Sequence, residues 1–136
     1  MNAETEITII NFLKKRIPEI SGIYVFGSFA DYTATNESDI DIGFLTRNKI
    51  SAVEKWEVQE ELASLLDSDV DLVDLKDASV ILRTEVIEKG KRIYSSDTYE
   101  TDYFEMTTYS MYADLNESRI DILNDFKEKY GRDTTK

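Results

Sequence analysis

Residues 22–45 read GIYVFGSFADYTATNESDIDIGFL, and this stretch decides the fold. Its apolar run at 23–26 predicts a short buried strand, and the Gly27-Ser28 dipeptide after it predicts a turn. After ten more residues, the segment 39–42 alternates between acidic and apolar side chains, which predicts a second strand. Successive side chains on a strand point to opposite faces. We therefore expect Ile40 and Ile42 in the core and the two aspartates together on the other face.

The aspartates of this strand, Asp39 and Asp41, predict a site for a phosphorylated substrate. Two carboxylates held this close repel each other unless a cation or a proton lies between them. A hard divalent ion with oxygen ligands, above all Mg²⁺, meets that requirement. The turn at Gly27-Ser28 offers backbone N–H groups and a hydroxyl, which are groups that bind phosphate. The combination indicates nucleoside triphosphate chemistry.

The composition narrows the class of protein. With 136 residues the chain is long enough for one domain with its own core. The absence of cysteine and histidine excludes a disulfide framework, a cysteine zinc site and a histidine acid or base. No apolar run approaches the roughly 20 residues of a membrane span, and the first ten residues do not resemble a signal peptide. We expect a cytoplasmic protein.

The formal net charge of −12 indicates which kinds of molecule the protein binds. Proteins that bind nucleic acid usually carry a basic patch, whereas the lysines and arginines here form only small clusters. The charge argues against direct binding of long RNA or DNA. It favours a cationic small molecule or a basic protein as partner, or it serves only to keep the protein soluble.

The rest of the chain predicts helices and strands in alternation. Apolar residues at helical spacing predict a helix over 4–16, ended by Pro18. Ser51 has the pattern of an N-cap for a helix over 52–66. We expect the buried side of that helix to consist of Val53, Trp56, Leu62, Leu65 and Leu66. A strand over 68–75, a helix over 79–89 closed by Gly90 and an edge strand over 91–94 follow.

The last third of the chain predicts one long helix or two, because residues 99–130 contain neither glycine nor proline. Its apolar residues are too many for one narrow stripe, so the helix needs more than one surface to pack on. One of these surfaces would be the chain's own domain. The other would bind a partner, unless the helix folds back and buries all of its apolar residues internally.

One sequence pattern resembles a known signature. It consists of Gly27-Ser28, ten further residues and Asp39-x-Asp41, with Ser38 directly before the first aspartate. This pattern resembles the signature of the DNA polymerase β-type nucleotidyltransferases. More narrowly, the chain resembles the minimal nucleotidyltransferases encoded beside HEPN-domain toxins, the MntA-type antitoxins. The resemblance implies an α/β (α+β) fold, with helices flanking a small mixed β-sheet and an additional C-terminal helix. It also implies a catalytic domain over 1–96 and a helical extension over 97–136 that packs on it and binds a partner.

Besides Asp39 and Asp41, we expect a third carboxylate in the site, and it should come from the strand over 68–75. Alternation places Asp69 and Asp71 on one face of this strand and Asp74 on the other. The segment 70–75 resembles the family's third-carboxylate strand, in which the first aspartate is catalytic. This implies that Asp71 joins Asp39 and Asp41 in catalysis and in binding two Mg²⁺ ions, with Asp69 in reserve.

The resemblance also implies how the nucleotide binds. ATP would be the substrate, held by Gly27, Ser28 and Ser38. One departure concerns the residues shortly after the Gly-Ser turn, where relatives often carry Arg-Gly and this chain has Asp31-Tyr32. The loss of that cation would weaken nucleotide binding or change its geometry.

Three hypotheses for the function remain open. By resemblance, the chain would transfer AMP to a tyrosine of a cognate HEPN ribonuclease toxin, in a hetero-oligomer with it. The acceptor would otherwise be a cationic antibiotic, as in the related aminoglycoside nucleotidyltransferases, which generally carry a helical domain that this chain is too short to supply. In the third hypothesis the chain is a non-catalytic antitoxin that blocks the toxin by binding alone.

Overall fold

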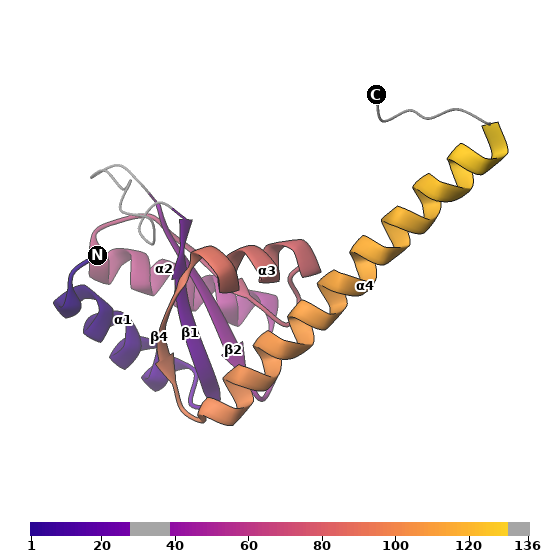
Figure 1. The fold of residues 1–136 in the computed structure, drawn as a ribbon. Coiled ribbons are helices and arrows are strands. Elements are labelled where there is room, and N and C mark those ends of the chain that lie inside the picture. The colour runs from indigo at the N-terminus through magenta and orange to yellow at the C-terminus, as the bar shows by residue number, and fades with distance from the viewer. Residues whose placement is uncertain (28–38, 131–136) are drawn as a thin grey trace.

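The computed structural model describes residues 1–27 and 39–130, and within 117–130 it describes the backbone only. The described residues form four helices and four strands, which Figure 1 shows in their arrangement. They are α1 (Ala3–Arg16), β1 (Ile20–Phe26), β2 (Ile40–Thr46), α2 (Ala52–Leu66), β3 (Val70–Asp74), α3 (Val80–Lys89), β4 (Lys91–Ser95) and α4 (Thr98–Tyr130). The predicted fold class, a small mixed sheet flanked by helices, is confirmed. None of the described helices is long and apolar enough to cross a membrane.

The strands form one sheet in the order β3-β2-β1-β4. β1 runs antiparallel to both β2 and β4, whereas β2 and β3 are parallel. A parallel pair needs a crossover connection, and α2 supplies it. β4 lies at the edge of the sheet, as the sequence predicts.

The helices cover the two faces of the sheet in pairs, as Figure 1 shows. On one face, α1 and α2 pack on a core that includes Ile42 and Phe44. On the other, α3 and the first part of α4 pack on a smaller core around Tyr24 and Leu45. Because side chains alternate along β2, Asp41 lies on this second face.

α4 is a single helix, which settles the choice between one helix and two. Its 33 residues correspond to a length of roughly 50 Å, and Figure 1 shows its far end standing away from the sheet. Thr101 is fully buried in its first turn, where a Cβ at Gly22 of β1 would approach Thr101 Cγ2 within 2.9 Å. The absence of a side chain at Gly22 therefore lets α4 lie directly on the sheet.

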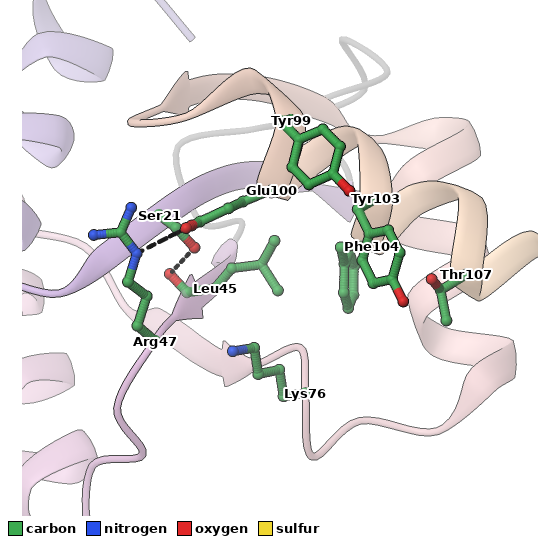
Figure 2. A pocket seen from close by; sticks show the side chains of 9 residues that line it. All are labelled: Ser21, Leu45, Arg47, Lys76, Tyr99, Glu100, Tyr103, Phe104 and Thr107. Atoms are coloured by element: carbon green, nitrogen blue, oxygen red, sulfur yellow. Dashed lines mark hydrogen bonds and ion pairs between the residues drawn. The ribbon is translucent and has the colours of Figure 1, made fainter.

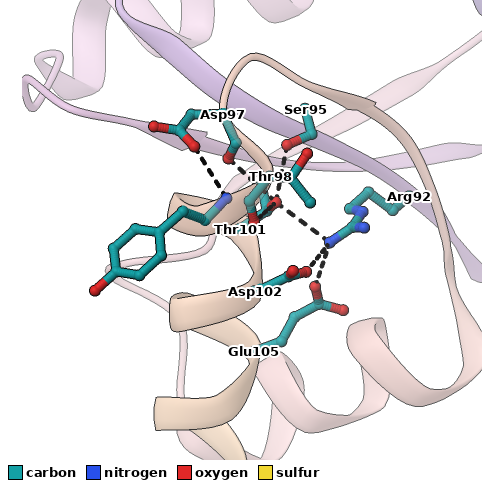
Figure 3. A network of polar contacts seen from close by, with 8 residues as sticks. Arg92, Ser95, Asp97, Thr98, Thr101, Asp102 and Glu105 are labelled. Carbon is teal, nitrogen blue, oxygen red and sulfur yellow. Dashed lines mark hydrogen bonds and ion pairs between the residues drawn. The ribbon is translucent and has the colours of Figure 1, made fainter.

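Polar contacts from β4 fix the start of α4 in place (Figure 3). Nη1 of Arg92 donates to Oδ1 of Asp102 at 2.9 Å and to Oε2 of Glu105 at 2.6 Å. It also donates to the Thr101 hydroxyl at 3.2 Å. These bonds join the edge strand to the first turns of α4.

The prediction of the buried side of α2 is wrong at three positions. Val53, Trp56 and Leu65 are 67%, 60% and 55% exposed, while Val58 and Leu62 are fully buried. Only one stripe of a helix, repeating every three or four residues, faces a sheet on one side of it. In α2 that stripe contains Val58 and Leu62, four residues apart, and the other three apolar side chains lie outside it.

Candidate active site

Gly27, at the end of β1, is held close to the first strand of the site. Its φ of +70° lies in the left-handed region, which residues with a side chain rarely adopt. The register pairs the preceding residue, Phe26, with Asp41 of β2. A Cβ at Gly27 would overlap the Oδ2 atom of Asp41. A glycine is therefore required here both by the backbone and by the neighbouring carboxylate.

Two of the predicted carboxylates are direct neighbours across the parallel strand pair. Asp41 of β2 lies opposite Asp71 of β3 in the register. Val73 packs in the core on the second face of the sheet, so Asp71, two residues earlier, points to that same face. Burial raises the pKa of Asp41, and the negative charges of Asp71 and Asp39 raise it further. A cation placed between these groups would relieve that repulsion.

The other predicted aspartates lie in different surroundings. Asp39 is exposed and directly precedes β2. Asp69 precedes β3, and its carbonyl oxygen accepts a 2.9 Å hydrogen bond from the N–H of Ile40. Asp74 is 7% exposed, and its Oδ1 atom accepts from the N–H of Lys76. It belongs to the opposite face from Asp71, as alternation predicts. Ser28, Ser38 and the Asp31-Tyr32 pair lie outside the described residues.

A cavity of about 330 Å³ opens beside these groups. The described residues lining it are Phe26, Gly27, Asp41, Glu85 and Lys89. The last two come from α3 and were not predicted as site residues. Their spacing of four residues indicates a shared helix face, but nothing local in the sequence indicates that this face meets Asp41.

A second cavity, of about 410 Å³, lies at the opposite end of the sheet (Figure 2). It is bounded by Leu45 near the end of β2 and by Tyr99, Tyr103 and Phe104 of α4. Its cations are already bonded, since Arg47 pairs with Glu100 at 2.9 Å and Lys76 Nζ donates to the Thr46 carbonyl at 2.7 Å. The smaller cavity is therefore the better candidate for chemistry, because it contains the carboxylate with the perturbed pKa.

The donor set suits Mg²⁺ bound together with a substrate. Among the described residues, no three carboxylate, histidine or cysteine side chains are placed to enclose a metal ion by themselves. Mg²⁺ does not usually need such an enclosure, because it is commonly bound by one or two carboxylates and the phosphates of a substrate. Asp41 and Asp71, as adjacent oxygen donors that repel each other, fit this type of site.

A family model described as polymerase beta nucleotidyltransferase matches residues 8–99. The chain belongs to the polymerase beta nucleotidyltransferase family. Within the family, it is 39% identical over 125 residues to the protein adenylyltransferase MntA of Shewanella oneidensis. That similarity covers 92% of this chain and 89% of the relative.

Two solved structures share the fold over most of the chain. One is described as a toxin–antitoxin with AMP-PNP, and its matching chain is 40% identical with a TM-score of 0.80. The match covers 89% of this chain and 97% of that one. The other is the tri-AMPylated Shewanella oneidensis HEPN toxin in complex with MNT antitoxin, at 37% identity, a TM-score of 0.77 and coverage of 93% and 98%. The resemblance to the MntA-type antitoxins is confirmed.

Proposed function

We propose that this chain is an antitoxin that transfers AMP from ATP to a tyrosine of a cognate HEPN-family ribonuclease toxin and thereby neutralises it. The observation that carries the proposal is the close approach of Gly27 to Asp41, with Asp71 opposite Asp41 in the register, in a chain 39% identical to an adenylyltransferase. A structure of a tri-AMPylated HEPN toxin with its antitoxin supports the choice of acceptor. We place the reaction in the cytoplasm, where ATP is available.

The residues of the proposed site come from two strands and from the turn after β1. Asp39, Asp41 and Asp71 would hold Mg²⁺, with two ions expected from the chemistry of nucleotidyl transfer. Bound there, Mg²⁺ would neutralise the charge that develops on the phosphoryl oxygens. The exposed backbone of Gly27 and the hydroxyls of Ser28 and Ser38 would bind the phosphates.

The reaction requires an in-line displacement at the α-phosphorus. The tyrosine hydroxyl of the toxin forms a bond to the α-phosphorus of ATP, while the bond from that phosphorus to the bridging oxygen of the β-phosphate breaks. Pyrophosphate leaves with the bonding electrons, and the hydroxyl proton passes to a base. We assign that role to Asp71, because its side chain is exposed and it lies opposite Asp41 in the register.

We further propose that 1–96 forms the catalytic domain and that 97–136 packs on it and binds the toxin. Large apolar side chains remain exposed along the described part of α4. They are Tyr99, Tyr103, Met106, Tyr109 and Met111. Tyrosine and methionine are enriched in the centres of protein interfaces, which supports this surface as the docking face.

The test is an intact-mass measurement of the toxin after incubation with this protein, ATP and Mg²⁺. We expect the toxin to gain one or more AMP units, and we expect Asp41→Asn or EDTA to abolish the gain. Tight binding of the toxin with no gain in mass would refute the catalytic proposal and favour inhibition by binding alone. Protection of cells by the Asp39→Asn/Asp41→Asn double variant would point the same way.

A further inference from the structure

The cavity beside Asp41 is strongly acidic for a site that receives a polyanion. Asp41 and Glu85 line it, and the charges of Asp39 and Asp71 are near enough to raise the pKa of Asp41. A triphosphate entering this cavity meets carboxylates of its own sign, so binding requires positive charge close by. Divalent ions would supply part of this positive charge, and cationic side chains of the protein would supply the rest.

The segments that build the proposed catalytic groups contain no cationic side chain. Residues 17–46, which include Gly27, Asp39 and Asp41, contain neither lysine nor arginine. The same is true of residues 67–75, which include Asp71. Any lysine or arginine at this site must therefore come from another part of the chain.

Lys89, in the last turn of α3, is the one cation among the described residues that line the cavity. The close approach of the next residue, Gly90, to the end of β1 holds it there. A Cβ at Gly90 would lie 3.0 Å from the Val25 carbonyl and 3.2 Å from Phe26 Cβ. The N–H of Gly90 also donates to the Val86 carbonyl at 2.9 Å, which closes the helix at this position. The end of α3 thus lies against β1, one residue before Gly27.

The ammonium of Lys89 is available for a ligand. It forms an ion pair with Glu85, one turn earlier on α3, with 3.8 Å between Nζ and Oε1. That separation is too long for a hydrogen bond, and both side chains are more than half exposed. An exposed pair of this kind contributes little to stability, so exchanging Glu85 for a phosphate loses little.

We propose that Lys89 binds the phosphate tail of ATP and that Glu85 competes with the nucleotide for it. The inference rests on the proposed function, because it takes ATP to be the ligand of this cavity. In the free protein the carboxylate of Glu85 pairs with the lysine, and in the complex the phosphates replace it. Lys89 is thus a substrate-binding residue on α3 that compensates for the lack of cations in the site strands.

Titration calorimetry with α,β-methylene-ATP and Mg²⁺ tests this assignment, because the analogue cannot be cleaved at the reacting bond. The Lys89→Met variant loses one charge-assisted contact at a solvent-accessible position. Its affinity for the analogue should therefore be about tenfold lower than that of wild type. Lys89→Arg should keep most of the affinity, and Glu85→Gln should raise it above that of wild type. The affinity of Lys89→Met should also depend less on salt concentration. In the transfer reaction, KM for ATP should rise more than kcat falls.

Lys49 provides the matched control, since its side chain is as exposed as that of Lys89 and pairs with Asp77 at 3.4 Å. It lies beyond the other end of β2, so Lys49→Met should leave nucleotide binding unchanged. A Lys89→Met variant that unfolds like wild type, binds the toxin like wild type and also binds the analogue like wild type would overturn this inference alone. A wild-type protein that does not bind the analogue would overturn both this inference and the proposed function.

Discussion

Replacing Gly27 by alanine tests the contact on which the candidate site depends. At a φ of +70°, a residue with a side chain costs roughly 1–2 kcal/mol relative to its favoured conformation. The new Cβ would also overlap Oδ2 of Asp41 and lie 3.3 Å from its Cγ. Moving the Asp41 side chain off its rotamer costs about 0.5–1.5 kcal/mol more. We expect Gly27→Ala to lower the free energy of unfolding by about 1.5–3.5 kcal/mol.

The two contributions separate in a double-mutant cycle with Asp41→Ala. That change removes Oδ2 and Cγ and leaves the Asp41 Cβ, 3.6 Å from the added methyl, which is an ordinary contact. In this background Gly27→Ala should cost only the backbone part, about 1–2 kcal/mol. Urea unfolding of the four proteins in EDTA measures the difference, which should be about 1 kcal/mol and exceeds the usual error of such cycles.

An equal cost of Gly27→Ala in both backgrounds would refute the reasoning, because it would show that the carboxylate does not lie against the turn. Gly27→Asn provides a control for the backbone part. Asparagine tolerates the left-handed region better than alanine but brings the same Cβ, so most of its cost should disappear when Asp41 is also changed. Both Gly27 variants should lose AMP transfer, since Asp41 is displaced in each.

Three further predictions concern the charge, the core and the helix contacts. The pKa of Asp41 in the folded protein is raised above its ordinary value of 3.8, so the folded state binds this proton more tightly than the unfolded state does. The protein therefore loses stability as the pH rises from about 3.8 through the folded-state pKa. Asp41→Asn should therefore raise the melting temperature of the metal-free protein at pH 7 but not at pH 3, and a lower melting temperature at pH 7 would contradict this. Phe44→Ala should cost about 3–5 kcal/mol in urea unfolding, whereas Trp56→Ala, at an exposed position, should cost under about 0.5 kcal/mol. Arg92→Met should cost about 1 kcal/mol or less and speed amide exchange in the first turns of α4, with unchanged exchange counting against the network of Figure 3.

The local elements of this fold could be predicted from the sequence because their causes are local. The helix over 52–66 begins after Ser51, whose side chain accepts from the N–H of Glu54, and it ends where predicted. Gly90 closes α3 by a bond to a carbonyl four residues earlier. Period and cap chemistry depend on neighbours in the chain, so they are readable without the fold. The buried side of α2 could not be predicted in this way, because the stripe of side chains that packs depends on where the sheet lies.

The candidate site shows the same division. By itself the sequence determined the turn at Gly27 and the alternation that puts Asp41 on one face, and it left both Asp69 and Asp71 as candidates on their strand. Only the tertiary structure decided that Asp41 and Asp71 are opposite each other, because strand order and register join segments separated by a whole helix. It also decided that the end of α3 brings Lys89 beside Asp41. Such contacts arise from packing between distant segments, which no local pattern in the chain encodes.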